Sequence, residues 1–253
     1  MSISLRNSPR AGINGRFRGS DRQNTKNEVT GGRTVTQFYA GFDTSIYPGD
    51  GTLEWLLKNT NLTWTGFYLG PAPTHGDTTW MPKYTSLKSM GWGFAPVYVG
   101  QQMGSSSLIN GPQGTIDAKN AASLAQQAQI PLMSTLFLDI EMGGPLPREM
   151  VQYYSSWCAQ VKICQYNPGL YCSHYQTAAQ LSAVFQARVW NWNISVYPQP
   201  ADFKNNYPEL NPALSGYPSS CCWQLLQNLS IPVNGQNLKV DLDSARMPDP
   251  SSA

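Results

Sequence analysis

After residue 35 the chain repeats one pattern, in which a short apolar segment typical of a buried strand is followed by a segment typical of a helix. The strand segments are residues 37–42, 65–69, 94–99, 136–140, 169–173, 189–193, 222–226 and 238–242. The helical segments are residues 53–58, 82–89, 115–129, 148–164 and 176–185. Repeated strand–helix units imply parallel strands joined by right-handed crossovers. Eight strands in about 215 residues predict an α/β fold, a closed (β/α)8 barrel of the TIM type with room for one helix to be reduced or missing.

The composition is that of one main domain. Of the 253 residues, 41% are apolar and 13% are charged, which allows one substantial core and argues against a disordered or coiled-coil protein. We divide the chain into a basic flexible tail at 1–35, a barrel at 36–247 and a C-terminal tail at 248–253.

Two features bear on where the protein acts. No apolar run approaches the roughly 20 residues needed to cross a bilayer, so no transmembrane segment is expected. The first residues, MSISLRNSPR, lack the apolar centre of a secretory signal. We therefore expect synthesis in the cytoplasm without a signal peptide, and export by a non-classical route if the protein acts outside the cell.

The N-terminal segment is basic and poor in large apolar residues. Its charged residues up to position 33 are Arg6, Arg10, Arg16, Arg18, Arg22, Lys26 and Arg33 against Asp21 and Glu28. Such a segment is predicted to be flexible by itself. It fits a handle for a secretion or injection machinery, a contact for acidic polymers, or a solvated extension without function. The remainder is slightly acidic, so nucleic acid is not an expected partner.

Acidic residues stand at the ends of several predicted strands. Asp139 and Glu141 close an apolar run, and because side chains alternate along a strand they project from one face about 6 to 7 Å apart. Asp43 ends the first strand, and Asp241 and Asp243 end the last. Active sites of such barrels lie at the carboxyl ends of the strands, so all five acids are expected on one rim. Neighbouring acids can hold different protonation states, as glycoside hydrolysis requires.

Five short motifs occur in order along the chain. They are Gly41-Phe42-Asp43-Thr44-Ser45, Phe137-Leu138-Asp139-Ile140-Glu141, Pro168-Gly169-Leu170-Tyr171-Cys172-Ser173, Trp223-Gln224 and Val240-Asp241-Leu242-Asp243. Together they resemble the glycoside hydrolase family 25 lysozymes and, more closely, the glycoside-hydrolase-like domain of unknown function related to them. The resemblance covers roughly residues 36 to 247. It implies a barrel and a substrate that is peptidoglycan or another amino-sugar polymer.

The resemblance also implies roles for the acids. Glu141 would be the general acid that protonates the leaving glycosidic oxygen. Asp139 would stabilise the charge developing on the sugar, directly or by orienting the substrate's acetamido group, and Asp43 and Asp241 would tune and position that pair. Close like charges and burial both raise the pKa of one member of such a pair. The sequence leaves retaining, substrate-assisted and inverting outcomes open. Asp243 stands where the lysozymes usually have Asn.

Aromatic and polar residues near the strand ends are candidates for substrate binding. Flat rings can stack on the apolar faces of sugars, and each of them can equally be core. Trp192 and Trp223 are preferred because they lie closest to the expected rim. The candidate set is Trp192, Trp223, Gln224, Tyr171, Tyr98, Gln101 and Asp243.

The cysteine and histidine residues give no metal-binding pattern. The five cysteines include no CxxC pair and the two histidines are far apart, so no metal site and no cofactor are expected. Cys158 and Cys172 are predicted to be ordinary buried thiols. A pairing of Cys221 or Cys222 with Cys158 or Cys164 in an oxidising compartment stays open.

Three hypotheses for function follow. The preferred one is a lysozyme- or muramidase-like glycosidase acting on a glycan substrate, with no metal or cofactor. The second is a carbohydrate-binding barrel without catalysis. The third is a cargo or structural component of a secretion or injection apparatus, and it is compatible with the first if the barrel is a delivered effector.

Overall fold

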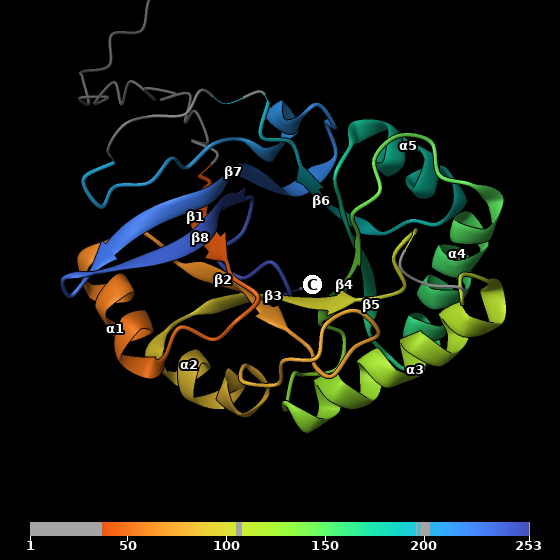
Figure 1. Ribbon diagram of the computed structural model, residues 1–253, viewed down its shortest axis with the longest axis horizontal. Helices are drawn as coiled ribbons and strands as arrows, with labels where there is room; N and C mark the ends of the chain where they lie inside the picture. Colours follow the sequence, from red (N-terminus) through yellow and green to blue (C-terminus); the bar gives the residue numbers. More distant parts are fainter. Residues whose placement is uncertain (1–36, 105–107, 196, 198–202, 253) are drawn as a thin grey trace, which may run out of the picture. The chain divides into compact units, whose positions relative to one another are not determined.

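The computed structural model describes residues 37–104, 108–195, 197 and 203–252. In this part of the chain eight strands close into a barrel in sequence order, with α-helices around its outside (Figure 1). The strands are β1 (Tyr39–Asp43), β2 (Trp64–Tyr68), β3 (Gly93–Val99), β4 (Thr135–Ile140), β5 (Asn167–Cys172), β6 (Arg188–Trp192), β7 (Ser220–Val233) and β8 (Gln236–Ala245). The helices are α1 (Asp50–Asn59), α2 (Tyr84–Met90), α3 (Gly111–Gln127), α4 (Arg148–Ile163) and α5 (Tyr175–Val184). The predicted barrel is confirmed.

The direction of the last strand differs from the prediction. Strands β1 to β7 are parallel, whereas β8 is antiparallel to both β7 and β1. The reason is the two-residue connection Asn234-Gly235, whose φ angles of 49° and 78° are those of a tight hairpin turn. A parallel neighbour needs a crossover of a dozen or more residues, so this turn forces a hairpin. Asn-Gly between two apolar runs is a hairpin signal that the helix–strand pattern obscured.

The described part contains the five predicted helices, whereas a complete (β/α)8 barrel has eight and the fold prediction left room for one helix to be reduced or missing. No helix separates β7 from β8 or follows β8 up to residue 252, and the described part of the connection from β6 to β7 holds only a short 3-10 helix, η2 (Pro212–Ser215). The described part of that connection covers the outside of the barrel instead. Leu210 pairs with the Ser244 hydroxyl, which accepts from its amide at 2.9 Å and donates to its carbonyl at 2.7 Å. Asn61 and Tyr207 likewise exchange two hydrogen bonds, of 2.8 and 2.7 Å.

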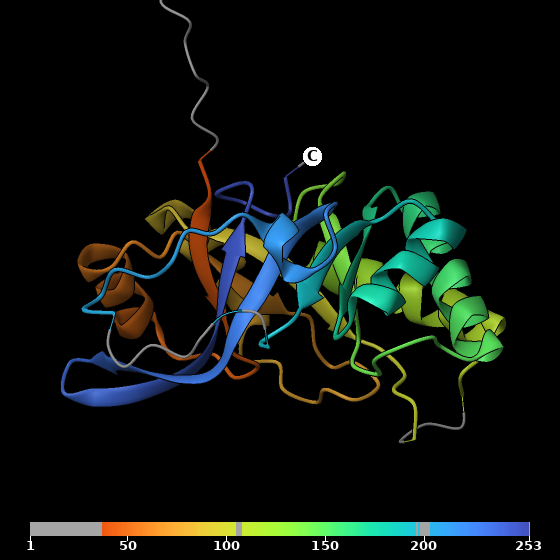
Figure 2. The ribbon, with the colours of Figure 1, turned by 90° about the horizontal axis from the view of Figure 1, so that it is seen from above.

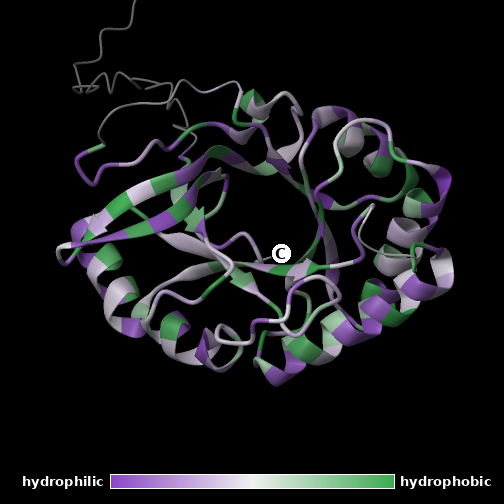
Figure 3. Ribbon diagram, in the orientation of Figure 1, coloured by the Kyte–Doolittle hydropathy of each residue, from purple (hydrophilic) through white to green (hydrophobic). Residues whose placement is uncertain are grey.

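Apolar side chains form two layers, because successive residues of each strand point to opposite faces. Inside the barrel, Trp190 contacts Trp64 and Phe137 edge-on, with ring centroids 5.5 and 5.9 Å apart. Outside it, residues such as Leu136 and Leu138 pack against the helices, which carry both hydrophobic and hydrophilic bands (Figure 3). The rings of Trp64, Phe137 and Trp190, which we call the aromatic plug, fill the interior toward one end of the barrel, the lower end. Polar side chains occupy the interior at the other end.

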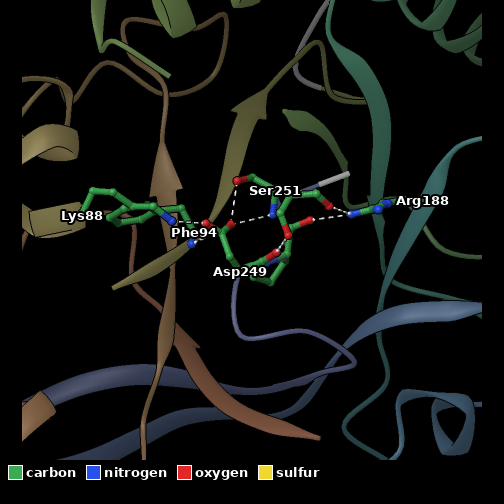
Figure 4. A network of polar contacts seen from close by, with 7 residues as sticks. Lys88, Phe94, Arg188, Asp249 and Ser251 are labelled. Carbon is green, nitrogen blue, oxygen red and sulfur yellow. Dashed lines mark hydrogen bonds and ion pairs between the residues drawn. The ribbon is translucent and has the colours of Figure 1, made fainter. Parts of the chain in front are cut away.

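The lower end, which we call the floor, is closed by the residues that follow β8. Asp249 Oδ1 accepts from the amides of Phe94 and Ser251 at 3.3 and 3.0 Å and from the Ser251 hydroxyl at 2.6 Å, while Oδ2 pairs with Lys88 (Figure 4). Arg188 donates to the Pro250 carbonyl at 3.1 Å. Residues 248–252, set apart as a tail in the sequence, thus contact the strands. The predicted domain boundaries stay predictions, and the basic segment 1–35 lies outside the described residues.

The cysteines are free thiols. Cys158 and Cys172 are buried, as expected, and neither Cys221 nor Cys222 is bonded to Cys158 or Cys164. No helix within the described ranges has the length and apolar character to span a membrane.

Candidate active site

A cavity of about 460 Å³ opens at the end of the barrel opposite the floor, which we call the rim. Figure 2 shows the C-terminus at one end of the barrel and the long β7–β8 hairpin projecting at the other. The volume lies within the range of small-ligand sites. The cavity is lined by Asp43, Thr44, Ser45, Tyr68, Thr74, His75, Val99, Asp139, Glu141, Tyr171, Trp192, Gln227, Asn228, Lys239, Val240 and Asp241.

The structure brings most of the predicted acids together. Asp43, Asp139, Glu141 and Asp241 all line this one cavity, although nearly two hundred positions separate the first from the last. Asp43 and Asp139 reach it from the carboxyl ends of parallel strands, as expected. Asp241 reaches it for a different reason: β8 runs downward from the hairpin, and its register places Asp241 directly opposite Asp43.

Asp243 lies below the cavity rather than on its wall. It is fully buried two residues further along β8, where its carboxylate accepts a hydrogen bond from Trp190 Nε1 at 3.0 Å. Its predicted contact with substrate is therefore replaced by a contact with the aromatic plug. The antiparallel direction of β8 is the cause, because the chain enters the barrel from the rim and moves deeper with each residue.

Three predicted binding residues lie away from the cavity. Trp223 and Tyr98 point outward into the core between strands and helices, where the Trp223 indole donates to the Asn193 carbonyl at 2.9 Å. Neighbouring residues on a strand point to the opposite face, so Gln224, next to Trp223, points into the barrel. Gln101 is buried outside the barrel, donating to Asp117 at 3.0 Å. The alternation of side chains along a strand explains why Trp223 and Tyr98 point away from the barrel interior.

Trp192 and Tyr171 do line the cavity, as predicted. The Trp192 indole nitrogen is buried without a hydrogen-bond partner. The Tyr171 hydroxyl donates to Gln224 Oε1 at 2.6 Å, and Gln224 Nε2 donates to Asp241 Oδ2 at 2.8 Å. Gln224 is thus buried under the cavity as a bridge, holding Asp241 by one oxygen while the Asn228 amide holds the other at 2.7 Å.

Gln102, which the sequence did not single out, fixes the segment that carries the central acids. Its amide nitrogen donates to the Asp139 carbonyl at 2.9 Å, and its amide oxygen accepts from the Glu141 backbone N–H at 3.1 Å. Ser173 donates to the Glu141 carbonyl at 2.6 Å from the neighbouring strand end. Both residues just follow barrel strands, which is the only sequence signal that could have found them.

Asp139 and Glu141 have different surroundings. Asp139 is 5% exposed and its Oδ1 has no hydrogen-bond partner, whereas Glu141 is exposed at the mouth of the cavity. Burial first, then the charges of Glu141 and Asp43, raise the pKa of Asp139 well above its ordinary value. Asp139 is therefore the buried member of the pair, and Glu141, to which the resemblance gives the role of acid, is the exposed member.

Asp43 sits between these groups and β8. Its Oδ1 accepts a hydrogen bond from the Tyr68 hydroxyl at 2.7 Å. Burial, followed by the charge of Asp241, raises the pKa of Asp43 to about 7, against the opposing effect of the Tyr68 hydrogen bond. Burial likewise raises the pKa of Asp241. Tyr68, like Asp43, is the last residue of its strand, a position that marks a rim residue.

His75 and Lys239 are further cavity residues that sequence reasoning missed. The His75 ring packs on Tyr68 with centroids 5.3 Å apart, and burial lowers its pKa. Lys239 comes from the β7–β8 hairpin. Neither residue stands in a local pattern that distinguishes it from a surface residue.

The fold and the site are thus those of a closed barrel with a carboxylate-lined cavity at its rim. Residues 56–223 match the family described as Rv2525c-like, glycoside hydrolase-like domain, and the chain belongs to this family. The match includes Asp139 and Glu141 and leaves Asp43 and Asp241 outside it. A search of curated proteins finds no match.

Solved structures share the fold. An uncharacterized protein of B. stearothermophilus is 19% identical with a TM-score of 0.60, over 82% of this chain and 95% of that one. The Tat-secreted protein Rv2525c of Mycobacterium tuberculosis is 14% identical with a TM-score of 0.56, over 85% and 97%. A family 25 glycosyl hydrolase of Bacillus anthracis is 16% identical with a TM-score of 0.53, over 82% and 88%. The fold thus resembles that of family 25 glycosyl hydrolases.

Proposed function

We propose that the protein is a glycosidase that hydrolyses glycosidic bonds of peptidoglycan or a related amino-sugar polymer. The observation that carries this proposal is the convergence of Asp43, Asp139, Glu141 and Asp241 on one cavity of ligand size. Carboxyl pairs with unequal surroundings are what acid catalysis at a glycosidic bond requires. The family and the fold shared with a family 25 glycosyl hydrolase support the substrate class.

In this proposal Glu141 donates the proton to the leaving oxygen. A glycan lying across the mouth of the cavity would exclude water from Glu141, the condition under which a carboxyl donates a proton near neutral pH. Asp139, held by Gln102 from behind and with Oδ1 unpartnered, faces the position where positive charge develops or where an acetamido group needs a hydrogen bond. Asp43 and Asp241 form the part of the cavity wall beside Asp139.

The test is turnover of purified peptidoglycan, measured as released reducing ends and by mass spectrometry of the products. Glu141→Gln keeps the shape and removes the acid, and we expect a loss of about 10²–10⁴-fold in kcat, the size of a general-acid effect. Glu149→Gln is the matched control, because Glu149 is exposed in the first turn of α4 and does not line the cavity. Full activity of Glu141→Gln would remove the assigned acid.

A carbohydrate-binding barrel without turnover is the second candidate. It is favoured by the Trp192 ring on the cavity wall, since a ring can stack on a sugar while carboxyl groups hydrogen-bond to its hydroxyls without transferring a proton. This candidate expects glycan affinity that Trp192→Ala abolishes and no release of reducing ends. Any turnover by the wild-type protein excludes it.

Delivery through the basic segment is a separate proposal. A wall-cutting protein has to reach the wall, and seven basic residues up to position 33 could serve as the handle for a secretion or injection machinery. Deletion of residues 1–33 should then abolish export while peptidoglycan turnover by the purified barrel stays unchanged. Unaffected export of the truncated chain would contradict this proposal.

A further inference from the structure

Two buried carboxyl oxygens below the cavity lack a donor when both side chains are ionised. Asp43 and Asp243 each use Oδ1, for the Tyr68 hydroxyl at 2.7 Å and Trp190 Nε1 at 3.0 Å respectively. Oδ2 of each is buried without a donor, yet the two side chains are close enough to hydrogen-bond to each other. An oxygen–oxygen hydrogen bond needs a proton on one of them.

The backbone holds this pair together. Gly41 is the register partner of Asp243, so Asp43 lies diagonally across from Asp243 on the same inner face. Two glycines make the room. A Cβ at Gly41 would lie 2.2 Å from the Trp64 indole, which packs on Trp190, and a Cβ at Gly66 would lie 2.7 Å from the Asp43 Cβ. The two glycines therefore leave the space that the Trp64 ring and the Asp43 side chain occupy beside this pair.

The surroundings indicate which carboxyl is neutral. Asp243 is 0% exposed and lies deeper, whereas Asp43 is 5% exposed, lines the cavity and already has the Tyr68 donor. An isolated buried carboxylate is costly, and two facing carboxylates are more so. Burial, then the charges of Asp43 and Asp241, raise the pKa of Asp243 well above its ordinary value. In the part of the chain described, the titratable groups that face the pair are acids, tyrosines and a thiol: Tyr68, Asp139, Tyr171, Cys222 and Asp241.

We infer that Asp243 is held as a neutral carboxylic acid whose hydroxyl donates to Asp43 Oδ2, which makes it a positioning residue for the site. With this bond Asp43 accepts two hydrogen bonds, from Tyr68 on one side and Asp243 on the other, and its charge is fixed beside Asp139. Asp243 touches no substrate. The positioning role of Asp243 in catalysis rests on the proposed function, whereas its protonation state does not.

The first test needs no substrate. Asp243→Asn places an amide N–H donor in the same shape, and the infrared difference spectrum between wild type and variant near neutral pH should show loss of the carbonyl stretch of a protonated carboxylic acid. Asp249→Asn is the matched control, because Asp249 accepts several donors and pairs with Lys88 at the floor, and its spectrum should show loss of ionised carboxylate bands. Loss of ionised bands in Asp243→Asn would overturn the inference.

The second test uses turnover of peptidoglycan. Asp243→Asn should retain kcat within about threefold and extend the activity to higher pH, since an amide donor cannot be lost by deprotonation, while Asp243→Ala should lose at least about tenfold. An equal loss in both variants would contradict the positioning role. If the wild-type protein shows no turnover, the proposed function fails alone, and the infrared result still decides the state of Asp243.

Discussion

The floor and the rim of the barrel each hold an aspartate, partly buried at the floor and buried at the rim, and the two carboxylates have opposite surroundings. At the floor, Asp249 accepts three hydrogen bonds on one oxygen and pairs with Lys88 on the other. At the rim, Asp139 is buried with one oxygen unpartnered and with like charges as neighbours. A carboxylate that is fully hydrogen-bonded stabilises the fold, whereas a buried one left unsatisfied costs stability, and such costly groups are found most often at functional sites.

The comparison predicts that residues outside the cavity affect the fold and residues on its wall affect binding. Trp223→Ala should lower the free energy of unfolding by about 3–5 kcal/mol, because the indole is buried in the outer core. Trp192→Ala should weaken glycan binding with a much smaller change in stability, since Trp192 is only partly buried at the rim. Urea unfolding and glycan titration of both variants measure the two effects. Equal stability losses would break the distinction between the layers.

The next largest change in the free energy of unfolding is expected for variants of the floor. Asp249→Ala leaves the amides of Phe94 and Ser251 without their acceptor, and hydrogen bonds to a charged group contribute about 1.5–3 kcal/mol. We expect urea unfolding to show a loss of that size with unchanged turnover of peptidoglycan. Lys88→Met tests the ion pair alone and should cost under about 1 kcal/mol, because the Lys88 side chain is about half exposed to solvent. A floor variant that stays fully stable would contradict a structural role for Asp249.

The effect expected at Asp139 has the opposite sign. In the folded state the pKa of Asp139 lies above its ordinary value of 3.8, so the native protein binds more protons than the unfolded chain and loses stability as pH rises through that range. Asp139→Asn removes this loss and should raise stability by about 1–2 kcal/mol at about pH 8, with little gain below about pH 4. The variant should also lose turnover. Thermal melts across pH measure the first effect, and a uniform destabilisation would show that Asp139 is structural.

Much of the fold could be predicted because strand and helix patterns are local. The eight strands and five helices lie where the apolar periodicity indicates, within a few residues at most boundaries. The extended β7 and β8 are the exception, since their hairpin lies beyond the part that the barrel buries. The chain direction of β8 depends on the turn at Asn234-Gly235. The prediction missed this turn because it assumed that every strand–helix unit repeats the one before it.

The candidate site was predicted in its acids and less well in its other residues. Asp43, Asp139 and Glu141 follow from the rule that barrel sites lie at strand ends, which needs no knowledge of packing. Trp223 and Gln224 were both assigned to the groove, although adjacent residues of a strand point to opposite faces. Local alternation alone shows that only one of them can face the barrel interior.

The sequence by itself determined the set of strands, their order and the acids that end them, because these depend on residue type and on spacing along the chain. Only the tertiary structure decided which carboxyl is buried, which rings face the cavity and that Asp241 meets Asp43 from an antiparallel strand. Burial, register and charge proximity depend on segments far apart in the chain, and these raise the pKa values of Asp139, Asp43 and Asp243.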